Sequence, residues 1–274
     1  MTLLGWAELF LCLFITATSL DALLGMRRLG RLALADPIAG PAPRVSVVVA
    51  ARNEARGVEA GMRSLLAQHY PALEIVAVND RSTDETGAIL DRLALGEPRL
   101  RVVHVAELPA GWLGKNHALA LGAAAASGAW LLFTDADVVM QRDTLSRAIG
   151  HAERTGLDHL TVVPDLILPG LLKCFTVGFI VWFSVYVRPW KASDPKSRFF
   201  VGVGAFNLVR TTAYQRAGGH EPIRMRPDDD LKLGKILKRS GARAEALSGL
   251  DMASWGLSSM NFSMPARPLL STLT

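Results

Sequence analysis

The pattern of hydrophobic and polar positions divides the chain into an apolar N-terminal segment and a longer region of short alternating elements. Residues 3–24 are apolar except for Glu8, Asp21 and a few small polar residues, and three arginines follow within seven residues. A helix of this length matches the bilayer core, and the arginines favour a cytosolic position for the region that follows. We therefore expect residues 1–26 to form a transmembrane or membrane-anchoring helix. A buried or amphipathic helix is the alternative, because of the two carboxylates.

From residue 45 onward, β-branched runs alternate with helical patterns, after a proline-containing stretch, residues 27–43, that is typical of a linker. The pattern predicts strands over residues 45–50, 74–79, 100–105, 130–134 and 205–209. It predicts helices where Val58, Met62, Leu65 and Leu66 share one face and over residues 83–93, 116–127 and 228–240. Ser82 and Glu85 predict a capping box at the start of the 83–93 helix. Buried strands that alternate with helices indicate an α/β fold with a mostly parallel sheet covered on both faces.

A second apolar segment, residues 166–190, has only Lys173 and Arg188 as charges. The uncharged stretch between them is short for a bilayer span, so we expect an interfacial helix, or a buried one. Its aromatic residues recur at helical spacing, a pattern that is more often a core stripe than a lipid-presenting surface. Residues 251–274 have two charged side chains and no periodicity, which predicts an irregular tail or the truncated end of a longer chain.

Composition narrows the class of protein. Of 274 residues, 50% are apolar, 20% are charged and two are cysteines, which excludes a disordered chain and a disulfide scaffold. The mean hydropathy of +0.26 again suggests a membrane. The net charge of +5 is spread along the chain while the acids cluster, which argues against a nucleic-acid binder. A membrane surface or a polyphosphate ligand explains this balance.

Acidic side chains follow the predicted strands or begin a predicted helix. Glu54 follows the first strand, Asp80 ends the second, Asp135 and Asp137 end the fourth, and the run 228–230 begins the last helix. Because ligands bind at the carboxyl ends of parallel strands, we expect these acids to share one crevice. Like charges gathered there require a compensating cation or bound group.

A divalent cation that holds a diphosphate is the simplest compensation. Mg²⁺ or Mn²⁺ prefers carboxylate oxygens and keeps positions open for phosphate. Lys115, at the start of a predicted helix, is well placed for a phosphate, and one further carboxylate would act as a general base. Each feature alone has an ordinary explanation: an Asp-x-Asp turn, a solvated lysine, or acids that favour a helix N-terminus. Their order and spacing together are much more specific.

With these motifs, the chain resembles glycosyltransferase family 2, a GT-A-type family that uses nucleotide sugars. The matching segments are 47–54 (VVVAARNE), 78–84 (VNDRSTD), 135–137 (DAD), 202–206 (GVGAF), 218–219 (GG) and 229–234 (DDLKLG). A further segment, 111–116 (GWLGKN), is similar to the membrane branch that contains ceramide-glucosyltransferase-like and hopanoid-associated enzymes. The resemblance implies a GT-A-type glycosyltransferase domain over residues 44–250.

The resemblance also implies roles for the acidic residues. Glu54 and Asp80 would contact the uridine of a UDP-sugar donor, and Lys115 would lie by its diphosphate. Asp135 and Asp137 would be the metal-binding pair, with Asp137 the more direct ligand of Mg²⁺ or Mn²⁺. Asp230 would be the base, next to Asp229 in the family's acidic pair. The reaction would invert the anomeric carbon in one displacement by an acceptor hydroxyl.

Membrane association makes a lipid the expected acceptor, with the chain in the cell (inner) membrane and the catalytic domain cytoplasmic. Had residues 166–190 crossed the bilayer once, Asp230 would lie on the opposite side from Asp80 and Asp137. The shared site therefore requires that this segment does not span.

Two alternatives remain open at this level. The chain lacks the Q/R-x-x-R-W motif of processive and ceramide-type members, because Ala253-Ser254 precede Trp255 with no arginine. The first alternative to an active glycosyltransferase is therefore a catalytically impaired nucleotide-sugar-binding membrane protein. The second alternative is an enzyme of another class, a nucleotidyltransferase or an NAD-dependent oxidoreductase. Residues 51–54 (ARNE) argue against these two enzyme classes, because they stand where a G-x-G-x-x-G loop is expected, and no P-loop is present.

Overall fold

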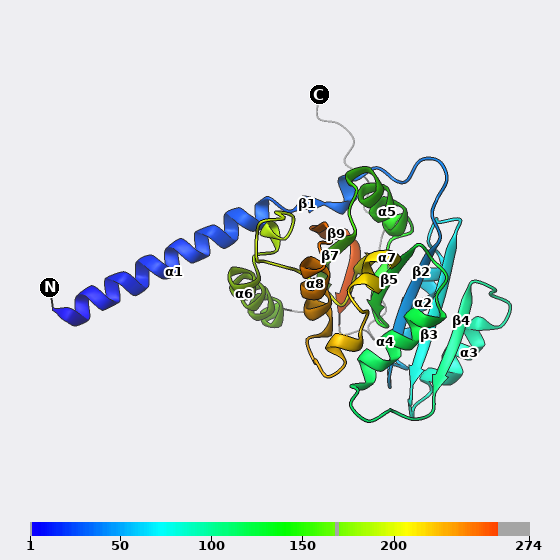
Figure 1. Cartoon of the computed structure of the whole chain (residues 1–274). Coiled ribbons are helices and arrows are strands. Elements are labelled where there is room, and N and C mark those ends of the chain that lie inside the picture. The colour runs from blue at the N-terminus through cyan, green and yellow to red at the C-terminus, as the bar shows by residue number, and fades with distance from the viewer. Residues whose placement is uncertain (1, 168–169, 257–274) are drawn as a thin grey trace.

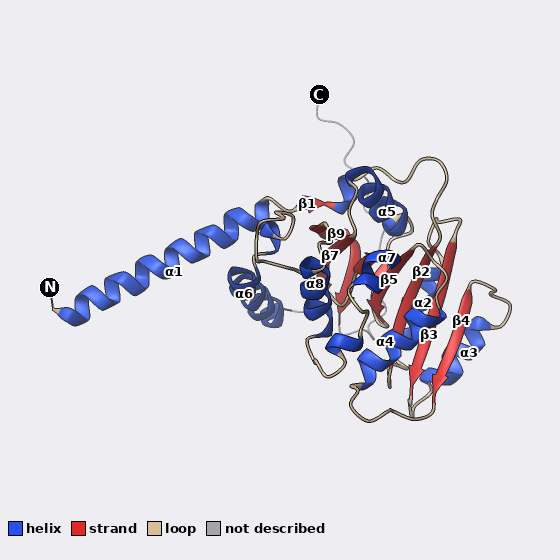
Figure 2. Ribbon diagram, viewed as in Figure 1, coloured by secondary structure: helices blue, strands red, loops and turns tan. Residues whose placement is uncertain are grey.

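The structure is a computed structural model that describes residues 2–167 and 170–256. Nine strands of this part form one sheet, in the order β1-β9-β7-β8-β5-β2-β3-β4 with β6 paired to β9. Figure 2 shows β5, β2, β3 and β4 side by side in this order. The strands are β1 (Gly30–Arg31), β2 (Val45–Ala51), β3 (Leu73–Asp80), β4 (Leu100–Val105), β5 (Trp130–Asp135), β6 (Val139–Met140), β7 (His159–Ile167), β8 (Asn207–Arg210) and β9 (Ala244–Gly256). The α-helices are α1 (Leu3–Arg27), α2 (Val58–Leu66), α3 (Thr86–Ala94), α4 (Gly114–Ala125), α5 (Thr144–Thr155), α6 (Gly170–Val187), α7 (Thr211–Arg216) and α8 (Asp229–Arg239).

Four adjacent strands, β5, β2, β3 and β4, are parallel, which confirms the mostly parallel α/β sheet expected from the sequence. The register pairs Ala50 with Asp135 and with Val78, so the carboxyl ends of β5, β2 and β3 meet at one edge. Beyond β5, the strand β8 runs antiparallel to both β5 and β7. The parallel half of the sheet therefore ends at β5.

Side chains of β2 alternate between two hydrophobic layers. Val47 and Val49 pack with buried residues of α2, α3 and α5, whereas Val48 packs with residues of α4, α7 and α8. Figure 1 shows these helices on the two sides of the sheet. This two-sided burial explains why β2 has buried valines on both of its faces and Ser46 as its one polar residue.

The capping box expected at Ser82 is wrong, since α3 begins only at Thr86 and has no side-chain cap. Ser82 Oγ instead accepts the backbone N–H of Asn53 at 3.1 Å, and the N–H of Thr83 donates to Asn53 Oδ1 at 2.8 Å. These contacts to the loop after β2 hold residues 82 and 83 outside the helix.

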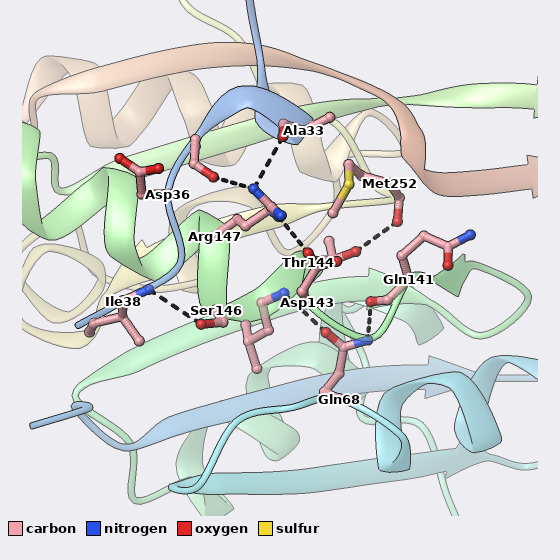
Figure 3. Close-up of polar contacts among 12 residues, drawn as sticks. Ala33, Asp36, Ile38, Gln68, Gln141, Asp143, Thr144, Ser146, Arg147 and Met252 are labelled. Atoms are coloured by element: carbon pink, nitrogen blue, oxygen red, sulfur yellow. Dashed lines mark hydrogen bonds and ion pairs between the residues drawn. The ribbon is translucent and has the colours of Figure 1, made fainter. Parts of the chain in front are cut away.

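The segment expected as a linker, residues 27–43, is packed against the domain. Residues 30–31 form β1 beside β9, and a short 3-10 helix, η1 (Leu32–Leu34), buries Leu32 completely. Arg147 of α5 donates to the carbonyls of Ala33 and Ala35 at 3.1 and 2.6 Å, and Ile38 N–H donates to Ser146 (Figure 3). This segment therefore fixes where α1 leaves the domain.

Further hydrogen bonds hold the start of α5 against the segment that follows α2 and against β9. The amide of Gln68 donates to the carbonyl of Gln141 at 2.7 Å and accepts the N–H of Leu145 at 3.0 Å. Thr144 Oγ1 donates to the carbonyl of Met252 in β9 at 2.7 Å (Figure 3). Residues 251–256, expected to be irregular, thus belong to β9, so the domain continues past residue 250; residues 257–274 lie outside the described residues.

The apolar segment 166–190 also differs from expectation at its start. Residues 166 and 167 pair with β9 as the end of β7, so the helix covers Gly170–Val187 and is followed by a 3-10 turn, η2 (Pro189–Lys191). The helix α6 packs against α1, which extends away from the domain (Figure 1). Within the described residues, one helix, Leu4–Arg27, is long and apolar enough to cross a membrane, and only 11% of its most apolar stretch is buried.

A bare glycine lets α2 lie against the turn between Asp135 and Asp137. A Cβ at Gly61 would lie 2.2 Å from the carbonyl oxygen of Ala136. We expect Gly61→Ala to lower the free energy of unfolding by about 1–3 kcal/mol, because backbone on both sides must move. The measurement is denaturant unfolding of the full chain in a neutral detergent.

Gly178→Ala on α6 is the control, since nothing lies within 4 Å of its added Cβ. Alanine is the better helix former, so this variant should be as stable as the wild type or slightly more stable. A Gly61→Ala variant with wild-type stability would contradict the close packing of α2 on this turn.

Candidate functional site

An open cleft lies at the carboxyl ends of the parallel strands. It has a volume of about 360 Å³, and the side chains lining it include Glu54, Asp80, Lys115, Asp135 and Asp137. These are five of the seven residues that the sequence predicted for the site. They converge because β5, β2 and β3 are parallel and adjacent, so each strand delivers its terminal acid to the same edge.

A second, smaller pocket adjoins this cleft. Lys115 and Asp135 line both, and Asp229, Asp230 and Gly204 complete the second one. The acids at positions 80, 137 and 230 therefore line two neighbouring pockets that share Lys115 and Asp135, and we refer to these two pockets together as the groove. Asp228 is not among the residues lining either pocket; it forms ion pairs with Arg226 and Lys232 on the surface.

Lys115 joins the two halves of the groove. Its Nζ lies 2.8 Å from Asp135 Oδ1 and 3.8 Å from Asp229 Oδ2. Burial alone would lower the pKa of Lys115, but these carboxylates outweigh burial and raise it above its ordinary value. The lysine therefore stays charged at neutral pH and compensates for the acids around it.

Asp229 is the more buried acid of the pair at the start of α8. Burial, with repulsion from Asp230 and Asp135, raises the pKa of Asp229 to about 6, although Lys115 opposes the shift. The 3.8 Å separation from Lys115 is long for an ion pair, which is why desolvation dominates. Asp229 is thus mostly ionised at neutral pH, but its surroundings destabilise the ionised form.

Asp230 is held in a fixed orientation by the backbone. Its Oδ2 accepts the N–H of Gly204 at 2.8 Å, and its Oδ1 accepts the N–H of Leu231 at 2.7 Å. Burial nevertheless raises the pKa of Asp230. Each oxygen keeps a second lone pair, so the carboxylate can still accept a proton from a bound hydroxyl.

Asp80 is buried and carries a two-point ion pair with its neighbour. Arg81 Nε and its terminal nitrogen lie 2.8 and 3.0 Å from the two carboxylate oxygens of Asp80. Arg81 adopts a φ of 54°, a left-handed conformation unusual for arginine, which turns it back onto Asp80. Gly114 permits this approach, since a Cβ there would lie 2.3 Å from Asp80 Oδ2.

The loops after β2 and β3 hold each other through side chains that sequence reasoning did not assign to the site. The N–H of Glu54 donates to Thr86 Oγ1 at 2.8 Å, and that of Ala55 donates to Asp84 Oδ2 at 3.1 Å. Asn53, at φ 57°, makes the reciprocal contacts with Ser82 and Thr83 described above. These five residues fix the position of Glu54, and only the left-handed preference of asparagine hinted at this in the sequence.

Asn116 is another residue whose role was missed. Its side-chain nitrogen donates to the carbonyls of Ile223, Arg224 and Arg226, at 2.8 to 3.1 Å. These carbonyls lie in the loop that leads to α8, so Asn116 couples the helix of Lys115 to the acids at 229 and 230. The GWLGKN segment therefore has a structural explanation in addition to the expected role of its lysine.

A buried histidine forms part of the floor of the second pocket. His220 Nδ1 lies 2.7 Å from the hydroxyl of Tyr214, and the histidine ring packs edge-on against Phe133. Burial, helped by the charge of Lys115, lowers the pKa of His220 to about 3. It is therefore neutral at physiological pH. Its position directly after Gly218-Gly219 was the available sequence signal.

A family model described as glycosyl transferase family 2 matches residues 46–215, more than half of the chain. The chain belongs to this family. The matched region contains Glu54, Asp80, Lys115, Asp135 and Asp137, and it ends before α8. The enzyme is thus a glycosyltransferase. Asp229 and Asp230 lie outside the matched region, but they line the same pocket as Lys115 and Asp135, which lie within it.

Individual relatives agree with this assignment. The glycosyltransferase is 34% identical over 131 residues to the succinoglycan biosynthesis protein ExoO of Rhizobium meliloti (strain 1021), which covers 46% of this chain and 36% of that protein. It is 36% identical over 111 residues to the beta-monoglucosyldiacylglycerol synthase of Synechocystis sp. (strain ATCC 27184 / PCC 6803 / Kazusa), over 40% of this chain and 23% of that one. The aligned region thus spans about a third or less of these relatives.

A solved structure shows the same fold. The mannosyltransferase PcManGT from Pyrobaculum calidifontis, in complex with GDP-Man and Mn²⁺, aligns with a TM-score of 0.65 at 24% identity. The alignment covers 93% of this glycosyltransferase and 66% of the mannosyltransferase. This likeness confirms the GT-A-type architecture.

The charges of the cleft fit a divalent metal ion that takes some of its ligands from the protein and the others from a phosphate. Within residues 2–167 and 170–256, no group of three or more His, Cys, Asp or Glu side chains is arranged to hold an ion by itself. Burial and the charges of Asp137 and Asp135 nevertheless raise the pKa of Glu54, so these acids repel one another. A Mg²⁺ or Mn²⁺ ion bound by one or two of these carboxylates and by phosphate oxygens would relieve that repulsion.

The raised pKa of Asp229 predicts a pH-dependent stability. Its folded pKa of about 6 exceeds the unfolded value of 3.8, so its favourable contribution is complete below pH 4 and is lost as the pH rises through 6. Relative to the wild type, Asp229→Asn should gain up to about 3 kcal/mol in unfolding free energy between pH 4 and pH 7. Denaturant titrations at both pH values measure the difference.

Asp228→Asn is the matched control. Burial opposes the shift, but Arg226 and Lys232 lower the pKa of Asp228 to about 2, so its stabilising effect is present above pH 4 and its removal should destabilise at pH 7. An Asp229→Asn difference that is flat with pH, or that has the same sign as the control, is the result that would refute a buried, strained Asp229.

Proposed function

We propose that this glycosyltransferase transfers a hexosyl group from a UDP-sugar to a hydroxyl of a membrane lipid, with inversion at the anomeric carbon. The observation that carries the proposal is the position of Lys115, which lines both pockets and lies between the acids of the donor cleft and the acid pair of α8. A donor diphosphate beside Lys115 would have its sugar directed toward Asp230.

The donor half of the groove has groups suited to each part of a nucleoside diphosphate. Glu54 and Asp80 offer carboxylates to the hydroxyl and N–H donors of a uridine. Lys115 would neutralise one charge of the diphosphate, and its position in the first turn of α4 adds the positive end of a helix dipole. The mannosyltransferase relative in complex with GDP-Man supports a nucleotide-sugar donor of this general kind.

A divalent metal would be held by Asp137, with Asp135 beside it. When bound, Mg²⁺ or Mn²⁺ supplies positive charge that stabilises the departing diphosphate. The Mn²⁺ in the complex of the mannosyltransferase relative supports this cofactor. Asp135 would also keep Lys115 in place through their 2.8 Å contact.

Asp230 would act as the general base. Its carboxylate, oriented by Gly204 and Leu231, takes the proton of the acceptor hydroxyl while that oxygen attacks the anomeric carbon. The bond from the anomeric carbon to the diphosphate oxygen breaks in the same displacement, and the electron pair leaves with UDP. Asp229 would hold Lys115 toward the leaving group.

The apolar helices support a lipid acceptor in the cell (inner) membrane. The helix α1 would anchor the chain in the membrane. The arginines that follow it favour a catalytic domain on the cytosolic side of the membrane. The helix α6 would lie in the interface, because a span there would separate Asp230 from Asp137. The diacylglycerol named in the synthase relative supports a glycerolipid hydroxyl as one acceptor class.

Replacement of the base tests the catalytic assignment. Asp230→Asn should lower transfer to membrane lipid extract by a factor of about 10² to 10⁴, because the amide cannot accept the proton. UDP affinity should stay largely unchanged, since Asp230 lies outside the donor cleft. Mass spectrometry of the lipid product and calorimetry with UDP measure the two effects.

Asp228 lies two residues before Asp230 and outside the groove, so the Asp228→Asn variant should transfer at the wild-type rate. Normal turnover by Asp230→Asn would reject Asp230 as the base. UDP-sugar binding by the wild type without turnover on any lipid would instead favour a nucleotide-sugar-binding protein with impaired catalysis.

Chelation tests the metal. Removal of divalent ions with EDTA should abolish transfer and weaken UDP binding, and Mn²⁺ or Mg²⁺ should restore both, because Asp137 would hold an ion whose charge stabilises the diphosphate. Asp137→Asn should need a higher metal concentration for the same rate. Transfer and UDP binding that persist at the wild-type level in EDTA would contradict a metal-dependent site.

A further inference from the structure

A cluster of cations lies at the end of α6 and does not line either pocket of the groove. The guanidinium carbons of Arg188 and Arg198 lie 5.3 and 5.5 Å from the ring centroid of Phe199, and Lys191 Nζ lies 5.9 Å from it. Each contact is in the range of a cation–π interaction. Three like charges around one ring also repel one another, so the cluster favours an anionic ligand.

Few carboxylates compensate these charges. Asp21 of α1 forms an ion pair with Arg188 at 3.3 Å, and no ion pair among the described residues involves Lys191 or Arg198. Residues 188–198 contain four cationic side chains against the single acid Asp194. The cluster therefore keeps an excess of positive charge after its internal pairing.

The cluster is held rigidly by close backbone packing. A Cβ at Gly202 would lie 1.9 Å from the carbonyl oxygen of Asp230, and one at Gly234 would lie 1.8 Å from that of Val201. Lys238 Nζ donates to the carbonyls of Ala192 and Asp194, both at 2.6 Å. The segment that carries the cations is thus fixed to α8 rather than free to adapt.

The surroundings of the cluster distinguish a membrane from a soluble anion. It lies at the C-terminal end of α6, whose exposed side chains include Phe175, Phe179, Trp182 and Tyr186. The end of α1 packs on the same place, because a Cβ at Gly25 would lie 2.2 Å from the ring of Trp190. Aromatic and cationic side chains at the end of exposed apolar helices are typical of the headgroup level of a leaflet.

We propose that Arg188, Lys191 and Arg198 form a binding site for the phosphate head group of an anionic phospholipid. The acyl chains would lie along the exposed apolar surface of α1 and α6, which a soluble phosphate has no means to use. Arginine forks bind phosphate at two points, and phosphatidylglycerol, unlike phosphatidylcholine, has no head-group cation to repel this cluster. The inference rests on the membrane association proposed above but on neither the donor nor the acceptor.

Lipid binding to the full chain in a neutral detergent tests this site. Native mass spectrometry would measure the affinity of dioleoyl phosphatidylglycerol and of dioleoyl phosphatidylcholine. The wild type should bind the anionic lipid about 25-fold more tightly, at roughly a factor of five for each of Lys191 and Arg198, since Arg188 is already paired with Asp21. Lys191→Gln with Arg198→Gln should remove most of this preference and leave phosphatidylcholine binding unchanged.

Two further double variants keep the test decisive. Arg101→Gln with Arg142→Gln removes the same charge from exposed positions on β4 and before α5, and should keep the lipid preference. Lys191→Arg with Arg198→Lys keeps the charge at the cluster and should keep it too. Equal wild-type affinity for the two lipids, or equal losses in the cluster variant and the distant control, would overturn the proposal. Because no sugar donor is present, failure of transfer does not affect this result.

Discussion

The parallel register of β5, β2 and β3 is the constraint on which the site depends. It places the carboxyl ends of three neighbouring strands at one edge, where Asp135, Glu54 and Asp80 follow or end those strands. The helix α8 brings Asp230 to the same edge because the loop before it is tied to Asn116 of α4. Asp135 and Asp230, which are 95 positions apart in the sequence, therefore repel one another through space.

This convergence creates an electrostatic problem that Lys115 solves only in part. The lysine contacts Asp135 at 2.8 Å, yet burial still raises the pKa values of Asp229, Asp230 and Glu54. A bound cation would relieve this residual repulsion, and a diphosphate held with it would offer hydrogen-bond acceptors to Lys115. The same imbalance that costs the folded state stability would therefore favour the donor complex.

Sequence patterns predicted the architecture well, because burial on both faces of a parallel sheet leaves an unambiguous β-branched signal. The strands β2 to β5 begin and end within one residue of their expected bounds, and the order of these parallel strands brings Asp80 and Asp137 to one cleft. The contacts that fix the loops were not predictable in this way. Asn53 and Arg81 adopt left-handed conformations stabilised by partners across two loops, and Asn116 binds carbonyls more than a hundred positions away. The linker was misjudged for the same reason, since its prolines suggest a loose connection whereas Arg147 and Ser146 of α5 hold it.

The central claim is that the acids of the groove bind one cation together with a nucleoside diphosphate. Anomalous diffraction from crystals of the chain grown with UDP and Mn²⁺ tests it most directly. The account predicts one strong manganese peak beside the carboxylate of Asp137, with the diphosphate oxygens on its other side and Lys115 in contact with them. A nucleotide found outside the cleft between Glu54 and Asp137, or a manganese ion remote from both the diphosphate and Asp137, would contradict it.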